Sequence, residues 1–174
     1  LTSAILFMAE RAETLVGIWG IGLAPTGERD PFGLRRAALG LISAFEQLTA
    51  GGILLIQQNG PLTLDDLIEA AALSFDAGTL AENTVTEVHA FIIERLRNQL
   101  FLLHDRPAVE SVLAIAPPVH QIPARVQAIE IFAKGPDAAS LAAANKRIGN
   151  LLKKAEGTLG AVNTRLLTEA AEQS

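Results

Sequence analysis

The sequence predicts an all-α fold, an irregular multi-helix array of about seven or eight helices. Apolar residues recur three and four positions apart along most of the chain, whereas the alternation of apolar and polar residues that marks strands is scarce. With 174 residues, 49% of them hydrophobic, the chain can bury a core without a disulfide or a metal. Breaks rich in proline and glycine fall between the helices and are interpreted as turns.

The first helix is expected from about Ser3 to Val16, because glycines at positions 17, 20 and 22 follow it. Its inward stripe is expected to hold Ile5, Met8, Ala12, Leu15 and Val16. These glycines are interpreted as permitting a tight corner between packed helices. A phosphate-binding loop is excluded, because the glycines are not followed by the sequence Gly-Lys-Ser or Gly-Lys-Thr.

The second helix is expected to start at Asp30-Pro31 and to end before Gly51. Aspartate is a favourable N-cap, and a proline in the first turn costs no hydrogen bond. The expected core residues of this helix are Phe32, Leu34, Ala38, Leu41, Ile42 and Phe45. The stretch from Ile53 to Ile56 is equally compatible with a short strand and with a loop or helical turn.

The third and fourth helices are expected to begin at capping boxes. Thr63 with Asp66 opens the third helix, to about Phe75, and Thr84 with Glu87 repeats the pattern. The fourth helix, from Val85 to Leu103, is the most amphipathic segment. Its inward face is expected to hold Val88, Ile92, Leu96, Leu100 and Leu103.

Three further helices are expected, from Arg106 to Pro117, from Pro123 to Ala133, and from Asp137, a candidate cap, to Gly157. The inward residues of the last are expected to be Leu141, Ala144, Ile148, Leu151, Leu152 and Ala155, with Lys146, Asn150, Lys153 and Lys154 on its exposed stripe. The tail from Thr158 is amphipathic.

Composition restricts the function. The net charge is -5, so a nucleic acid would have to bind at local basic patches rather than in a general basic field. With 5% aromatic residues and no tyrosine, base stacking is a poor expectation, and backbone phosphates are the better target. The absence of cysteine excludes a thiolate metal site and fits a cytoplasmic location. No apolar run approaches a membrane span, and because the chain starts at Leu1 we expect a piece of a longer protein.

The strongest candidate for RNA binding is a basic stretch near the C-terminus. Four cations and no carboxylate lie from position 145 to position 154 of an acidic chain. The candidate residues are Asn145, Lys146, Arg147, Lys153 and Lys154. Arg35 and Arg36 are further candidates, although pairing with a carboxylate such as Glu13 or Asp30 is an equal alternative. For the lysines, the alternative is an ordinary solvated helix face.

No catalytic or metal-binding residue is assigned. His104-Asp105 spells a dipeptide found in metal-dependent phosphohydrolases, but His89 and His120 are placed elsewhere and nothing brings them together. We expect His104 to lie at a helix C-terminus, where the partial negative charge favours an imidazole. A serine, histidine and aspartate triad cannot be assembled from dispersed histidines either.

Several motifs resemble the beta subunit of bacterial tetrameric glycyl-tRNA synthetases. The main ones are the run from Glu13 to Gly22, Pro25-Thr26-Gly27, and the run from Asp30 to Gly40. Further agreeing segments are Phe91-Ile92 with Glu94 to Arg97, Ala143 to Ile148 with Asn150 to Leu152, and Val162-Asn163 with Leu166-Leu167 and Glu169. Together they cover nearly the whole chain.

The resemblance implies a non-catalytic part of a heterotetramer that binds glycine tRNA and pairs with an alpha subunit. ATP and magnesium would be used on that alpha subunit, with no cofactor in this chain. It further implies that residues 1–60 are the end of an HD-like helical module. Residues 61–174 would precede an anticodon-binding module that this sequence lacks; alternatively, residues 1–174 form one compact unit.

One departure from the family pattern concerns the HD-like module. The usual Ala-Asp-Lys-Leu-Asp appears in this chain as Ala9-Glu10-Arg11-Ala12-Glu13, so glutamate replaces the aspartate that an active hydrolase would use as a metal ligand. A metal site needs several converging ligands. Two alternatives stay open: a purely structural protein-interaction module without RNA contact, and the remnant of a divergent HD-type phosphohydrolase.

Overall fold

The computed structural model of the chain describes residues 1–53, 56–57 and 60–154, and these have the predicted all-α fold. The chain divides into two compact units, residues 1–131 and residues 132–174. In the first unit lie α1 (Thr2–Gly20), α2 (Leu34–Ala50), β1 (Ile56–Gln57), β2 (Gly60–Pro61), α3 (Leu64–Ala72), α4 (Thr84–Leu100), α5 (Arg106–Leu113), the 3-10 helix η1 (Val119–Gln121) and most of α6 (Ile122–Ala133). The second unit contains α7 (Pro136–Lys154).

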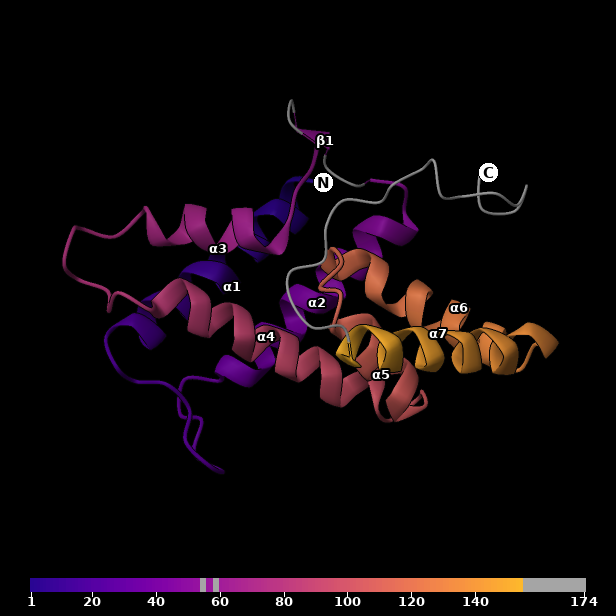
Figure 1. Cartoon of the computed structure of the whole chain (residues 1–174). Helices are drawn as coiled ribbons and strands as arrows, with labels where there is room; N and C mark the ends of the chain where they lie inside the picture. The colour runs from indigo at the N-terminus through magenta and orange to yellow at the C-terminus, as the bar shows by residue number, and fades with distance from the viewer. Residues whose placement is uncertain (54–55, 58–59, 155–174) are drawn as a thin grey trace, which may run out of the picture. The chain divides into compact units, whose positions relative to one another are not determined.

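The core of the first unit lies among α1, α2, α3 and α4. α1 contacts the other three helices, and α4 also contacts α2 and α3 (Figure 1). Leu15, Leu41, Ile68 and Ile92, one from each helix, are fully buried. Burying one such side chain stabilises the fold by about 1.5–3 kcal/mol. Residues on both sides of position 60 therefore share one core, and the division into modules 1–60 and 61–174 stays a prediction from the family.

α1 continues through Gly17 to Gly20 instead of ending at Val16. A Cβ at Gly17 would lie 2.7 Å from Phe75 Cζ, and a Cβ at Gly20 would lie 3.1 Å from Leu80 Cβ. The glycines thus let the chain after α3 lie against the helix. The turn itself comes at Gly22, where φ is +83°. Of the predicted inward stripe, Ile5 is exposed and the other four residues are buried.

α2 begins at Leu34, later than the predicted start at Asp30-Pro31. Its N-cap is Gly33, in the left-handed conformation at φ 68°. Asp30 nevertheless caps the helix from outside, because its carboxylate accepts hydrogen bonds from the backbone N–H of Leu34 (2.8 Å) and of Arg35 (2.9 Å). Phe32, predicted in the core, is exposed as a result, since it lies in the turn before the helix.

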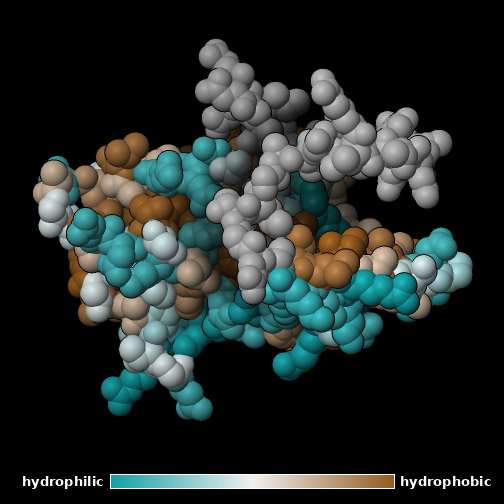
Figure 2. Space-filling view, viewed as in Figure 1, coloured by the Kyte–Doolittle hydropathy of each residue, from teal (hydrophilic) through white to brown (hydrophobic). Residues whose placement is uncertain are grey.

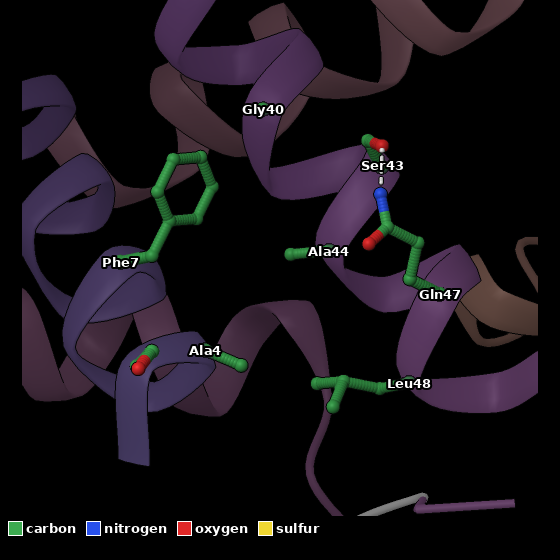
Figure 3. Close-up of a pocket in the computed structure, with 8 residues that line it drawn as sticks. Ala4, Phe7, Gly40, Ser43, Ala44, Gln47 and Leu48 are labelled. Atoms are coloured by element: carbon green, nitrogen blue, oxygen red, sulfur yellow. Dashed lines mark hydrogen bonds between the residues drawn. The ribbon is translucent and has the colours of Figure 1, made fainter. Parts of the chain in front are cut away.

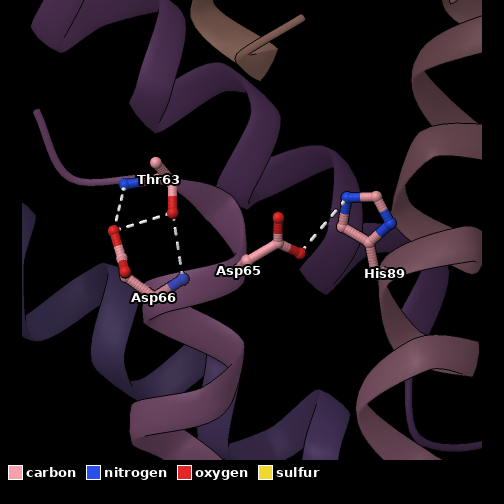
Figure 4. Close-up of polar contacts among 4 residues, drawn as sticks. All are labelled: Thr63, Asp65, Asp66 and His89. Atoms are coloured by element: carbon pink, nitrogen blue, oxygen red, sulfur yellow. Dashed lines mark hydrogen bonds and ion pairs between the residues drawn. The ribbon is translucent and has the colours of Figure 1, made fainter. Parts of the chain in front are cut away.

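The predicted capping box of α3 is confirmed. The Asp66 N–H donates to Thr63 Oγ1 (3.1 Å), and Asp66 Oδ2 accepts from the Thr63 N–H (2.9 Å) and hydroxyl (2.7 Å), as Figure 4 shows. The hydrogen bonds from the hydroxyl and then from the N–H lower the pKa of Asp66. Oδ1 of the neighbouring Asp65 lies 3.5 Å from Nε2 of His89 in α4, and this contact links α3 to α4.

The predicted capping box of α4 is wrong. Thr84 is the first helical residue rather than the cap, and its buried hydroxyl donates to the Ala81 carbonyl (2.6 Å). Glu87 instead accepts a hydrogen bond from the Trp19 indole N–H of α1 (2.8 Å). The Trp19 ring packs at 4.9 Å from that of Phe91.

The inward face of α4 is as predicted for Val88, Ile92, Leu96 and Leu100. Leu103, predicted on the same face, is exposed, because the helix ends at Leu100. β1 pairs with β2 in antiparallel register, so the stretch from Ile53 to Ile56 includes one strand residue.

The second unit contains α7, in which no described residue is buried. The predicted inward side chains Leu141, Ala144, Ile148, Leu151 and Leu152 are all exposed, so the prediction of their burial is wrong. Helical periodicity identifies an apolar stripe but not a surface for it to cover. Ala155, Gly157, the tail from Thr158 and the segment 162–169 lie outside the described residues.

Candidate nucleic-acid interface

Five of the seven residues predicted to bind RNA lie along α7. All five candidates are exposed: Asn145, Lys146, Arg147, Lys153 and Lys154. At about 100° per residue, Lys146, Asn150 and Lys153 point in nearly the same direction, with two further cations beside them. Within residues 136–154 the one carboxylate is Asp137, in the first turn. The result is a charged face that we call the basic face of α7, defined by Lys146, Arg147, Asn150, Lys153 and Lys154.

The opposite side of α7 is apolar. It carries Leu141, Ile148, Leu151 and Leu152, whose exposed fractions range from 52% to 69%. In Figure 2 the surface over α7 turned to the viewer is mainly hydrophilic. Lysine ammonium groups bind phosphate as point charges, so the basic face suits a phosphate backbone, and such contacts carry no sequence information.

Arg35 and Arg36 lie at the N-terminus of α2, in the other unit. A helix N-terminus ordinarily attracts anions, but here the carboxylate of Asp30 already accepts from the N–H groups of Leu34 and Arg35. The Arg35 guanidinium donates to the Gly27 carbonyl and so holds the preceding loop. Arg36 is exposed. This geometry favours a structural role for Arg35, though through a carbonyl rather than the expected carboxylate side chain.

The three histidines lie apart, in α4, in the turn after α4 and in η1. His104 follows the C-terminus of α4, as expected, and its Nδ1 lies 3.0 Å from Glu130 Oε2 of α6. The other oxygen of Glu130 accepts from the Asp105 N–H (2.8 Å). This link was not predicted, because Glu130 lies 26 positions from His104 and no local pattern connects them. In the described part of the chain, no three His, Asp or Glu side chains gather where they could hold a metal ion.

A groove with a volume of about 610 Å³ lies between α1 and α2. Figure 3 shows Phe7 and Ala4 of α1 facing Gly40, Ala44 and Leu48 of α2. Ser43 and Gln47 add polar groups, but they are hydrogen-bonded to each other at 3.0 Å. None of the residues that line the groove is titratable. The groove therefore suits apolar contact rather than catalysis.

Comparison with known proteins gives a consistent picture. The family described as "Glycyl-tRNA synthetase beta subunit" matches residues 1–114. The glycine–tRNA ligase beta subunit of Neisseria gonorrhoeae (strain NCCP11945) is 43% identical over 173 residues, which are 99% of this chain and 23% of that protein. The subunit of the same name from Ralstonia nicotianae is 42% identical over 175 residues, 99% of this chain and 24% of that protein.

A third relative, the glycine–tRNA ligase beta subunit of Leptothrix cholodnii, is 44% identical over 178 residues, covering 99% of this chain and 23% of that protein. The chain thus spans less than a quarter of the length of these curated relatives. Among the described helices, none is both long enough and apolar enough to cross a membrane.

Proposed function

Because this chain belongs to the family of glycyl-tRNA synthetase beta subunits, we propose that it serves the charging of glycine tRNA as a non-catalytic segment. In this proposal the chain binds the tRNA backbone and helps to hold the enzyme together in the cytoplasm. The ligase chemistry, with ATP and magnesium, takes place on the alpha subunit, as the resemblance implies. The chain itself supplies position and charge.

The observation that carries the RNA-binding part is the basic face of α7. Lys146, Arg147, Lys153 and Lys154 are exposed, and no ion pair within the described residues involves them. Free ammonium and guanidinium groups release counterions from a nucleic acid when they bind its phosphates. Three or four such contacts make binding depend on salt, with a log–log slope of about -0.7 to -0.9 per contact.

The test is binding of glycine tRNA to the purified chain at increasing potassium chloride. We expect the triple variant K146E/R147E/K153E to bind much more weakly and to lose most of the salt dependence. The variant R29E/R106E/R125E makes the same charge change on exposed arginines of the first unit that are not candidate binding residues, and it is the comparison for net charge. Equal tRNA affinity for the wild type and the α7 variant contradicts the proposal.

Scaffolding is the second part of the proposal, and the groove between α1 and α2 supports it. An apolar groove of about 610 Å³ can accept side chains from the alpha subunit. We expect Ala4→Arg, which fills the groove, to reduce co-purification with the alpha subunit. Leu6→Arg places the same charge on an exposed position of α1 outside the groove and should have no effect. Equal recovery of both variants contradicts this part.

A divergent phosphohydrolase is not favoured by the geometry. The Glu10 carboxylate, at the position of one of the two aspartates in the family pattern, is exposed, and its Oε2 lies 3.3 Å from Arg11 Nη1. His104 is engaged by Glu130, and His89 lies on α4 beside Asp65. The two histidine contacts join different helices, Glu10 pairs within α1, and the three groups do not converge on one position.

A further inference from the structure

We propose that the basic face of α7 binds a double-stranded stem of RNA along the phosphates of one strand, and not the unpaired bases of a loop. This inference rests on the proposed function and names the kind of RNA structure that the same surface takes. It follows from the spacing of the charged side chains, from the residue types on the helix, and from the distribution of charge over the chain.

The spacing matches a regular phosphate row. Lys146 and Lys153 are seven residues apart in one helix, so they are separated by about 10 Å along its axis. Asn150 lies between them on the same face. The phosphates of one strand of a duplex recur at regular intervals, so two cations about 10 Å apart on a rigid helix can contact phosphates of the same strand. An unpaired loop has no fixed spacing for a rigid helix to match.

The residue types on α7 favour contact with the backbone over recognition of unpaired bases. Within residues 136–154 there is no phenylalanine, tryptophan, tyrosine or histidine on which a base could stack. Of the four cations, three are lysines, whose ammonium groups bind phosphate as point charges. Asn150 can donate its amide to a phosphate or to a 2′-hydroxyl, both of which line the backbone of an RNA stem.

The charge distribution favours RNA at this face over the rest of the chain. α7 carries four cations and one carboxylate, a net charge of +3, so the rest of the chain carries -8. An acidic chain repels a polyanion except where its own positive charge is concentrated. The opposite side of α7 is apolar, with Leu141, Ile148 and Leu151, and offers nothing to phosphate. The positive charge of α7 is thus confined to its basic face, which can lie along the phosphates of one strand of a duplex.

The test compares a stem of about 12 base pairs with an unpaired strand of the same length, each titrated with the whole 174-residue chain. We expect tighter binding of the duplex, with a log–log salt slope of about -2 to -3. K146E/K153E should weaken duplex binding by at least about tenfold and reduce the slope by about two. K146Q/K153Q should act in the same direction, which separates loss of charge from its reversal.

The control is R29E/R125E, which has the same charge change as K146E/K153E on two exposed arginines outside α7. The affinity of this control for the duplex should stay within about twofold of the wild-type affinity. Far-UV circular dichroism should show equal helix content for all variants. If K146E/K153E weakens binding of the unpaired strand as much as the duplex, the stem inference is overturned while backbone binding by α7 stands. If K146E/K153E changes the affinity for neither the duplex, the unpaired strand nor glycine tRNA, the proposed function fails as well.

Discussion

Gly20 is an example of a residue whose role depends on a neighbour distant in sequence. In a helix interior glycine is less favourable than alanine by about 1 kcal/mol, which is why the glycines of α1 predict a helix end. In the fold, Leu80 packs directly on Gly20, and the Gly20 carbonyl accepts the Ala81 N–H at 2.9 Å. Close approach of the two segments outweighs the cost in helix propensity.

Gly20→Ala should therefore destabilise the protein. The added methyl group would overlap Leu80 Cδ2 and lie 3.1 Å from Leu80 Cβ, so Leu80 has to shift from its packed position. We expect the free energy of unfolding in urea to fall by about 1–3 kcal/mol. Gly149→Ala is the matched control, since a Cβ there meets no atom within 4 Å, and it should increase the helix content of α7. A stabilising effect of Gly20→Ala would contradict the packing described.

At the scale of the element, α3 is fixed at its start by Thr63 and Asp66. The carboxylate of Asp66 accepts two hydrogen bonds from Thr63, first of all from the hydroxyl, and these lower the pKa of Asp66 below its ordinary value of 3.8. A carboxyl whose pKa is lower in the folded state stabilises the fold while it is ionised, above its unfolded pKa. That contribution is lost as the pH falls through the folded pKa.

Asp66→Asn should consequently cost stability in a pH-dependent way. We expect the difference in urea midpoint between wild type and variant to be largest above about pH 5 and to shrink towards about pH 2.5, because acid neutralises the wild-type carboxylate. Glu69→Gln, at an exposed position of the same helix, should show a much smaller change with pH. A difference for Asp66→Asn that stays constant between these pH values would show that the charge on Asp66 does not matter.

Local patterns predicted the elements well and their ends less well. The capping box of α3 and the inward face of α4 depend on neighbours three or four residues away, which a sequence displays directly. The start of α2 was misplaced because Asp30 caps it from beyond Gly33, a geometry that needs a left-handed residue in the turn. The link between His104 and Glu130 joins distant segments, so only the fold reveals it.

For the whole molecule, burial is unevenly distributed between the two units. Every residue of the core cluster lies within residues 1–131, whereas α7 has no buried residue. Of the candidate RNA-binding residues on α7, Lys146, Lys153 and Lys154 were predicted as exposed, and they are exposed. Their function stays a prediction, because an exposed lysine looks the same on a solvated face and on a binding face.

Truncating one large side chain in each unit should reveal this contrast. Ile92 is 0% exposed at the centre of α4, and Ile92→Ala should lower the free energy of unfolding by about 2–5 kcal/mol. Leu151 is 69% exposed on α7, and Leu151→Ala should change it by less than about 0.5 kcal/mol. Urea denaturation followed by circular dichroism measures both. A large loss for Leu151→Ala would mean that the apolar side of α7 is covered in solution.

The contact between Trp19 and Glu87 gives the protein a built-in optical probe. Trp19 is the single tryptophan of the chain, and its indole N–H is hydrogen-bonded across from α1 to α4. Its emission therefore reports on the packing of these two helices alone, without any label. Separation of α1 from α4 would transfer the indole to water and shift the emission to longer wavelength, whatever happens on α7.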